Sequence, residues 1–373
     1  TMIAETKPDT VIVTTKDSTH HEFIIKGLDM GCDVLTEKPM TTDEEKCQDI
    51  LDAERRSNRK LIVGFNYRWG PYMTRIKELL QKGTIGRITS VDFHWYLNTY
   101  HGASYFRRWH GLRQAGGTLW VHKATHHFDL LNWWLDSDPQ EVFAYGDLEH
   151  YGSNGPFRGI KCRTCPHQEE CDFYWDITGN QRLMDLYVKN EQYDGYIRDN
   201  CLFRHDINIY DKMSAQVKYA DNTIVNYSLT TYSPYEGWKI AFNGMKGRIE
   251  AWLDIPHIKG EDISQADMHA QEMSQDDDQL DREPIIVHKL WNDYQVEQVQ
   301  FSRGGHGGGD SLLQNQIFRT PEKKDPFDRA AGVRDGAMSI LTGIGARKSI
   351  ESGQPVRIAQ LTDLEPRARR ILT

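Results

Sequence analysis

The sequence predicts an α/β protein in which part of a doubly wound parallel sheet precedes a C-terminal α/β domain with a large, mostly antiparallel open sheet. Residues 11–65 alternate short β-branched runs with helical patterns, in the order strand–helix–strand–helix–strand. Residues 141–253 contain β-type segments separated by tight turns, which is typical of antiparallel hairpins. The length of 373 residues exceeds the ~250–300 that one core usually holds. We therefore expect domains over 1–68 and 69–355, and a tail over 356–373.

The first domain is expected to contain short buried strands and amphipathic helices. The strands are predicted at Val11–Thr15, Val34–Thr36 and Lys60–Phe65, and the helices at His20–Met30 and Thr42–Arg56. Thr42 and Glu45 form a capping box at the start of the second helix. The other half of such a sheet carries a glycine-rich loop, and we expect that half to be absent, with the natural start upstream of Thr1. The glycine-dense segment Gly304–Gly309 lacks a surrounding strand–turn–helix unit and is rejected as that loop.

The second domain is expected to begin with a helix over Pro71–Lys82, followed by a long strand over Ile88–Tyr96. A strongly apolar helix is predicted over residues 118–135 and a C-terminal helix over residues 328–351. Further strands are predicted near 141–149, 214–219, 223–232, 238–243 and 248–253, with turns at Asp221-Asn222 and Met245–Gly247. The polar segment over residues 260–283 is expected to be a mobile loop.

The composition excludes several classes of partner. Asp and Glu number 54 against 45 Lys and Arg, and the net charge of −9 argues against non-specific nucleic-acid binding and against attraction to anionic lipid. The longest apolar stretches, such as Leu61–Phe65, are far too short to cross a bilayer. The 10 Trp and 17 Tyr suit sugar binding as well as core packing. We therefore expect a small-molecule partner, with no nucleic acid and no membrane.

An ordered series of motifs runs through the chain. His20 stands eleven residues before Gly31, and Glu37-Lys38-Pro39 follows at the end of the second strand. The later motifs are Val63–Arg68, Gly83–Gly86, Gly116-Gly117 and His126–Asp129. This series resembles the Gfo/Idh/MocA family of glucose–fructose oxidoreductase and inositol dehydrogenase relatives, from Thr1 to about Gln354.

The resemblance implies a Rossmann-type domain that binds NAD or NADP, and a C-terminal domain whose open sheet faces the substrate. It also implies a homodimer or homotetramer assembled through that sheet. The cofactor is expected to contact Thr14, Thr15, His20, Glu37, Lys38, Pro39, Asn66 and Arg68. The substrate is expected to contact Trp109, His122, Lys123, His127 and His306.

Lys38, His126 and Lys123 are the candidate catalytic residues. An ammonium group at Lys38 would stabilise the alkoxide that develops when a C–OH group loses a hydride, although an isolated Glu-Lys-Pro triplet is more often a surface turn. His126 is interpreted as the general base, against the alternative of a core histidine. His122 and His126 share a helix face at i,i+4, which leaves a zinc pair as a further alternative.

Four cysteines form a separate candidate metal site in the insertion over residues 151–201. Cys162, Cys165 and Cys171 have the spacing C-x2-C-x5-C, and Cys201 follows thirty residues later. Four thiolates suit structural zinc, and an iron–sulfur cluster, disulfides in an exported protein or free thiols are the alternatives. Cys32 and Cys47 are expected in the core.

The predicted function is hydride transfer between a nicotinamide cofactor and a hydroxyl of a sugar or an inositol-like polyol. One alternative is NAD-dependent glycoside cleavage by transient oxidation and elimination. Another is a non-catalytic sugar-binding or regulatory relative. The expected compartment is the cytoplasm, or the cell exterior if an upstream segment carries a signal.

Overall fold

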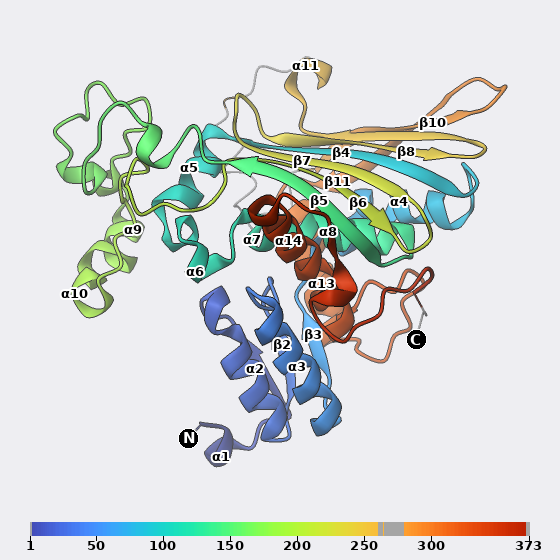
Figure 1. The fold of residues 1–373 in the computed structure, drawn as a ribbon, viewed down its shortest axis with the longest axis horizontal. Coiled ribbons are helices and arrows are strands. Elements are labelled where there is room, and N and C mark those ends of the chain that lie inside the picture. The colour runs from blue at the N-terminus through green and yellow to red at the C-terminus, as the bar shows by residue number, and fades with distance from the viewer. Residues whose placement is uncertain (1, 260–263, 265–279, 371–373) are drawn as a thin grey trace.

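The computed structural model describes residues 2–259, 264 and 280–370. Two sheets organise these residues. A four-stranded sheet has the order β1-β2-β3-β12, and a nine-stranded sheet has the order β11-β10-β9-β8-β4-β7-β6-β5-β13. The smaller sheet and its helices lie below the larger sheet in Figure 1, with further helices between the two. This confirms the predicted fold class.

The smaller sheet has three parallel strands that follow the predicted order. The short helix α1 (Met2–Thr6) precedes β1 (Thr10–Val13), β2 (Asp33–Thr36) and β3 (Leu61–Val63), and the crossover helices are α2 (His20–Asp29) and α3 (Glu44–Ser57). The strand β12 (Ala331–Gly332) adds antiparallel to β3. The prediction of Thr42 as the helix cap is wrong by one residue. Asp43 is the N-cap, because its carboxylate accepts the Lys46 N–H at 3.0 Å.

The larger sheet is mostly antiparallel, as predicted. Its strands are β4 (Ile88–Asn98), β5 (Pro139–Asp147), β6 (Lys212–Tyr219), β7 (Ile224–Ser233), β8 (Gly237–Gly244), β9 (Gly247–Leu253), β10 (Leu280–Lys289), β11 (Gln295–Ser302) and β13 (Val356–Arg357). The central strand β4 pairs in parallel with β7 and antiparallel with β8. Strand alternation buries Phe93 and Trp95 on the face that the helices cover.

The hairpin of β10 and β11 was not predicted from the sequence. The expected loop over residues 260–283 lies mostly outside the described residues, and its last four positions belong to β10. Both strands carry charged or amide side chains between their apolar residues, and β11 is the edge of the sheet. An edge strand needs few apolar side chains, so its sequence pattern resembles that of a loop.

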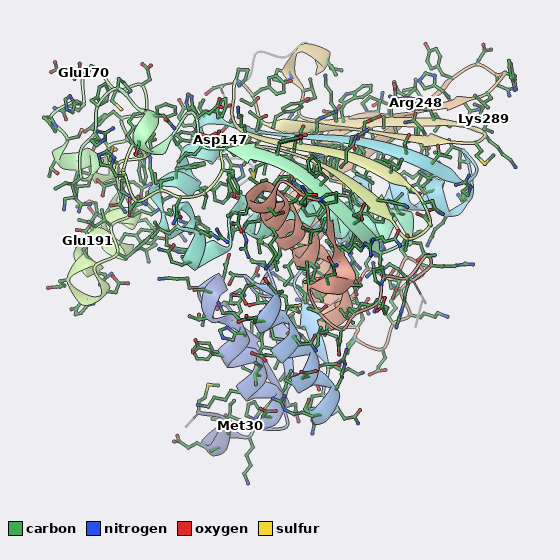
Figure 2. All side chains as sticks on the ribbon, in the orientation of Figure 1. Met30, Asp147, Glu170, Glu191, Arg248 and Lys289 are labelled. Carbon is green, nitrogen blue, oxygen red and sulfur yellow. The ribbon has the colours of Figure 1, made fainter. Side chains whose placement is uncertain are left out.

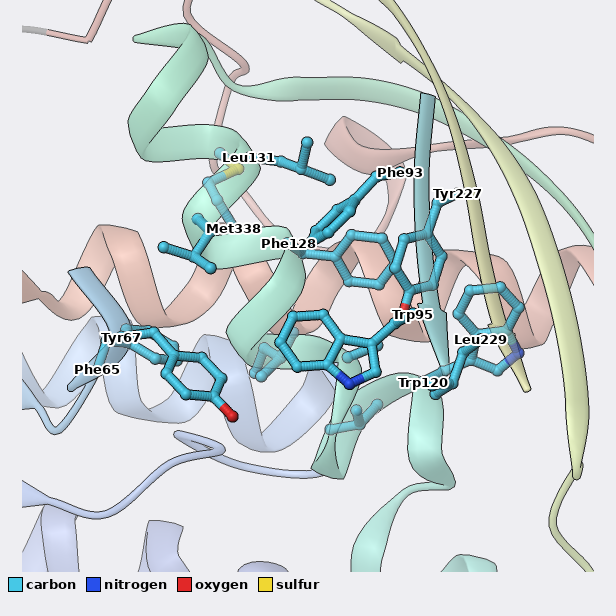
Figure 3. Close-up of a cluster of buried hydrophobic side chains, with 14 of the residues drawn as sticks. Phe65, Tyr67, Phe93, Trp95, Trp120, Phe128, Leu131, Tyr227, Leu229 and Met338 are labelled. Carbon is cyan, nitrogen blue, oxygen red and sulfur yellow. The ribbon is translucent and has the colours of Figure 1, made fainter. Parts of the chain in front are cut away.

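One hydrophobic layer joins the large sheet to the helices α8 (Ala124–Leu135) and α14 (Val333–Ser352). Figure 3 shows Phe128 of α8 and Met338 of α14 beside Phe93 and Trp95 of β4. The single helix predicted over residues 118–135 is wrong, because it is divided into α7 (Leu119–His122) and α8 at Lys123.

The remaining helices surround this layer. They are α4 (Pro71–Gln81), α5 (Thr99–Arg107), α6 (Arg113–Gly116), α9 (Gln181–Leu186), α10 (Glu191–Asp194), α11 (Pro256–Lys259) and α13 (Gly305–Phe318). The insertion over residues 151–201 forms a lobe at one end of the large sheet, where Figure 2 labels Glu170 and Glu191. We call it the insertion lobe. Among the described residues, no helix combines the length and the apolar character needed to cross a membrane.

Candidate active site

His20 organises the carboxyl ends of the parallel strands. It is the first residue of α2 and is 1% exposed. Its Nδ1 lies 2.8 Å from the carbonyl oxygen of Pro39, and its Nε2 lies 2.9 Å from that of Thr15. The ring therefore ties the loop after β1 to the loop after β2. Lys38 precedes Pro39 in the second loop, so His20 helps to fix its position at the edge where such sheets bind ligands.

Lys38 is half-buried and makes no salt bridge to any of the described residues. Burial lowers the pKa of its ammonium group. The acidic groups of Glu37 and Asp17 oppose this shift, whereas Lys123 and Arg108 add to it. An ammonium group with a lowered pKa exchanges protons more readily near neutral pH than an ordinary lysine does.

His126 lies on α8 at the same place and is 2% exposed. Its ring centroid is 4.5 Å from that of Tyr67 and 6.1 Å from that of His306. Burial lowers its pKa well below 6.5, and the charges of Lys38 and Lys123 lower it further. The Nδ1 atom is buried without a hydrogen-bond partner among the described residues. The imidazole is therefore neutral at neutral pH and able to accept a proton.

Lys123 occupies the break between α7 and α8. Its Nζ lies 3.5 Å from the hydroxyl of Tyr67 and 5.3 Å from the centroid of the Trp95 ring. Lys123 is 4% exposed, so the rings of Tyr67 and Trp95 enclose its ammonium group and keep it near His126. The structure thus brings Lys38, Lys123 and His126 together.

His122 faces a different partner. Its Nδ1 lies 2.5 Å from Oδ2 of Asp17, which follows β1. Burial raises the pKa of Asp17 to about 7, against the opposing charges of Lys38 and His20. The His122 ring also lies against His110, with centroids 4.1 Å apart, and Trp109 stacks on His110 at 3.6 Å. Sequence reasoning missed Asp17 and His110, although the position of Asp17 just after a parallel strand could have indicated it.

Two residues that the sequence assigned to ligands point into the protein. His127 stacks on Trp95 at 3.8 Å and lies 2.6 Å from the hydroxyl of Tyr227. Arg68 is 1% exposed and makes a bidentate ion pair with Asp129, at 2.5 and 2.7 Å. His122 and His126 lie on two consecutive helices that meet at Lys123, and the charge of Lys38 acts on both rings.

The glycine segment reaches the site from α13. His306 Nδ1 lies 2.9 Å from Nδ2 of Asn66, and the same amide nitrogen donates to Asp310 at 2.6 Å. A Cβ at Gly309 would lie 2.4 Å from the carbonyl oxygen of Asn66, so only glycine allows this approach. Asn66 Oδ1 is buried without a partner among the described residues. This orphaned acceptor and Nδ1 of His126 fit a bound polar ligand such as a nicotinamide cofactor with its substrate.

A cavity of about 70 Å³ adjoins this group. It is lined mainly by aromatic and charged side chains, among them Tyr67, Trp95, Trp238, Glu236, Arg303 and His306. Aromatic faces beside charged groups suit a carbohydrate ring and its hydroxyls.

The four cysteines of the insertion lobe line one small apolar cavity and are all free thiols. Arg107 donates to Cys162 Sγ at 2.9 Å, and two backbone N–H groups lie 3.4 Å from Cys201 Sγ. Across the described ranges, no group of three or more His, Cys, Asp or Glu side chains is arranged to hold a metal ion. The structure therefore does not support the predicted zinc site. Cys32 and Cys47 are buried in the core, as predicted.

Parallel strands that present a lysine at their carboxyl edge, beside a histidine from a second α/β domain, define an NAD(P)-dependent dehydrogenase. The family model for the oxidoreductase family's NAD-binding Rossmann fold matches residues 1–65, and the model for its C-terminal alpha/beta domain matches residues 77–358. The chain belongs to this Gfo/Idh/MocA oxidoreductase family, which confirms the resemblance found in the sequence.

Individual relatives agree with this membership. The protein YteT of Bacillus subtilis (strain 168), named as an oxidoreductase, is 39% identical over 377 residues, which cover 98% of this chain and 84% of YteT. Inositol 2-dehydrogenase 2 of Saccharopolyspora erythraea is 39% identical over 87 residues, covering 23% of this chain and 26% of that protein. The solved structure of a levoglucosan dehydrogenase with NADH and levoglucosan has a TM-score of 0.61 at 15% identity, covers 94% of this chain and 80% of its own, and shares the fold.

Proposed function

We propose that this protein transfers a hydride between a nicotinamide cofactor and a hydroxyl group of a sugar or an inositol-like polyol. The observation that carries the proposal is that Lys38, at the carboxyl edge of the parallel strands, lies near enough to His126 for its charge to act on the imidazole. Two lysines lower the pKa of His126 beyond the effect of its burial, which keeps the base neutral. The names of the relatives, an inositol 2-dehydrogenase and a levoglucosan dehydrogenase, support this class of substrate.

The proposed chemistry divides between the cofactor and the chain. When bound, the nicotinamide accepts or returns the hydride. Lys38 donates an N–H to the reacting oxygen and stabilises the alkoxide, while His126 takes the hydroxyl proton. Thr14, Thr15, Glu37, Pro39 and Asn66 follow the ends of the parallel strands, where the cofactor would be held, and the His20 ring contacts the loops after β1 and β2.

The substrate would lie between these groups and the C-terminal domain. Lys123 would bind a neighbouring hydroxyl, since Tyr67 and Trp95 hold its ammonium group beside His126. His306 would contact the substrate from the side opposite to Lys123. Trp109 and His122 would line the part of the substrate site that lies near Asp17. Arg68 and His127 are proposed as structural supports, because each is engaged inside the protein.

The test is turnover by the full-length protein. Sugars and polyols are supplied with NAD⁺ or NADP⁺, and formation of the reduced cofactor is followed. Oxidation of at least one substrate supports the proposal, and its loss in Lys38→Met identifies the site. Cleavage of a glycoside without net consumption of cofactor would instead show that the protein is an NAD-dependent enzyme that cleaves glycosides by transient oxidation and elimination. Sugar binding with neither reaction would contradict an enzymatic function.

Other proposals rest on the resemblance and on cysteine spacing. We propose that the domains divide at residues 68 and 355 and that the large sheet pairs with that of a second chain. The spacing of the four cysteines leaves zinc as a proposal, which elemental analysis tests, although their side chains are not arranged around a metal ion here. Light scattering of the purified protein measures the assembly. Elemental analysis is expected to find about one zinc per chain, lost in Cys162→Ser and in Cys201→Ser. A monomer, or protein without zinc, would contradict the corresponding proposal.

A further inference from the structure

Two arginines meet beside the reaction site. Arg108 follows the last residue of α5, and Arg198 reaches the same helix from the insertion lobe. Arg198 donates Nη2 to the hydroxyl of Ser104 at 3.3 Å, and its guanidinium lies 4.9 Å from the ring centroid of Trp175. Burial lowers the pKa of Arg198 to about 10, and the charge of Arg108 contributes to the shift. The two like charges therefore act on each other, and both side chains are half-buried.

Neither arginine has an acidic partner. In the part of the chain that the structure describes, neither makes a salt bridge. The Nε of Arg108 and the Nη1 of Arg198 are buried without a hydrogen-bond acceptor. Burying a guanidinium N–H without an acceptor costs free energy, so proteins usually pair such donors with an ordered water or with a ligand.

His110 connects the arginine pair to the catalytic residues. It is 3% exposed, and its Nδ1 also lacks a partner within the described ranges. Its ring packs against His122, whose Nδ1 lies 2.5 Å from Asp17. The charge of Arg108 acts on Lys38 and on His122, and the charges of both arginines act on His110, which connects the pair to the same site.

The site carries excess positive charge, although the whole chain has a net charge of −9. Its cations are Lys38, Lys123, Arg108 and Arg198. The acidic groups that act on Lys38 are Glu37, which is exposed, and Asp17, which is engaged with His122 and has its pKa raised to about 7. Around Lys38, two carboxyl groups thus accompany four basic side chains, whereas in the adjoining cavity Glu236 and Asp254 accompany Arg303.

We propose that the sugar substrate is an anion, and that Arg108, Arg198 and His110 bind its carboxylate or phosphate group. This inference rests on the proposed dehydrogenase function and names the substrate class of that site. A guanidinium presents parallel N–H donors that match the oxygens of a carboxylate or phosphate. The geometry also gives the insertion lobe a role, since it supplies Arg198.

The cofactor is the other possible source of such an anion. Its phosphates are expected at the glycine-rich first half of a Rossmann domain. Arg108 instead follows α5 and Arg198 belongs to the insertion lobe, and both lie in the part of the chain that the C-terminal family model covers. The substrate assignment therefore fits their position better.

The experiment compares matched sugars on the full-length protein. Glucose is paired with glucuronate and with glucose 6-phosphate, and galactose with galacturonate, each with NAD⁺ and NADP⁺. We expect kcat/KM to be ~10–100-fold higher for at least one anion than for its neutral partner, the usual effect of charge-assisted hydrogen bonds. Arg108→Met and Arg198→Met are expected to reduce this ratio by a similar factor. Arg113→Met is the matched control, because Arg113 is 44% exposed and pairs with Glu351.

Binding measured without turnover separates the two proposals. Calorimetry with glucuronate and with glucose tests the anion site even if no sugar is oxidised, a result that would overturn only the dehydrogenase function. Equal affinities for each neutral and anionic pair in wild type would overturn the anion site. So would variants that weaken binding of NADH while leaving that of the sugar acid unchanged. Arg108→Lys keeps the charge but loses the parallel N–H donors of the guanidinium. If this variant folds as wild type does, its affinity for the sugar acid should lie between those of Arg108→Met and wild type.

Discussion

The carboxylate of Asp17 and the imidazole of His122 lie 2.5 Å apart, between Oδ2 and Nδ1, and join the loop after β1 to the end of α7. Both side chains are buried. Burial raises the pKa of Asp17 to about 7 and lowers that of His122 well below 6.5. The pair therefore gains or loses a proton near neutral pH, beside the ammonium group of Lys38.

Asp17→Asn is expected to change how stability depends on pH. Between pH 4 and pH 7 the folded Asp17 keeps a proton that the unfolded chain has lost, so this stabilisation is complete below pH 4 and disappears as the pH rises through 7. The variant lacks this loss. Its free energy of unfolding, relative to wild type, should be about 3 kcal/mol more favourable at pH 8 than at pH 5. Urea unfolding at both pH values measures this, and an equal difference at both would contradict the raised pKa.

His126→Asn is expected to remove the acid limb of the activity profile. Burial and two lysines lower the pKa of His126 well below 6.5, so wild-type kcat should hold down to pH 6.5 and fall only below it. The variant should lose ~10²–10⁴-fold in kcat and the dependence on that protonation. His94→Asn is the control, because His94 bonds to Ser228 and alternates with Trp95 to the opposite face of β4. An acid limb that persists in His126→Asn would assign the base elsewhere.

Lys38→Met is expected to lower kcat by ~10²–10⁴-fold while changing cofactor affinity far less. Methionine keeps the apolar stem and removes the charge that would stabilise the alkoxide. Lys82→Met provides the comparison, since Lys82 is 60% exposed and pairs with Glu78 on α4. Steady-state kinetics and cofactor titration separate the two effects. Wild-type turnover in Lys38→Met would remove this lysine from the mechanism.

Lys123→Met should raise KM more than it lowers kcat, if Lys123 chiefly holds substrate hydroxyls. Its ammonium group lies beside the Tyr67 hydroxyl and over the Trp95 ring, so methionine can occupy the same aromatic wall. Initial rates over a range of substrate concentrations test this. A fall in kcat as large as that in Lys38→Met would instead give Lys123 a part in the chemical step.

The sequence contained enough information for the order of the elements and for the residues next to parallel strands. Short β-branched runs and helical periods indicate their own structure, so β1 to β3 and Lys38 could be located. The break at Lys123 could not, because an apolar pattern continues through it and only the contacts of the folded chain divide α7 from α8.

The parts of the site that were missed depend on contacts between distant segments. Arg198 reaches Ser104, 94 positions earlier, and Asp17 meets His122, 105 positions later. A lone arginine in a loop-rich lobe has no local signal that separates it from a solvated charge. The ion pairs of Arg68 could not be predicted either, because its partners Asp129 and Asp335 lie far away in the sequence.

Gly309→Ala tests whether the glycine segment positions the site. A Cβ there would lie 2.4 Å from the carbonyl oxygen of Asn66 and 3.2 Å from the backbone nitrogen of Gly70, so backbone must shift. The shift should separate His306 from Asn66, now 2.9 Å apart, and destabilise the protein by about 1–3 kcal/mol.

Gly179→Ala is the matched control, because a Cβ at Gly179 meets nothing within 4 Å. We expect Gly309→Ala to lower the melting temperature and to raise KM, whereas Gly179→Ala changes neither. If Gly309→Ala lowers stability but leaves KM unchanged, the segment supports the fold without touching the substrate, and His306 leaves the proposed site. If both variants behave as wild type, the close approach of Gly309 to Asn66 is absent in solution.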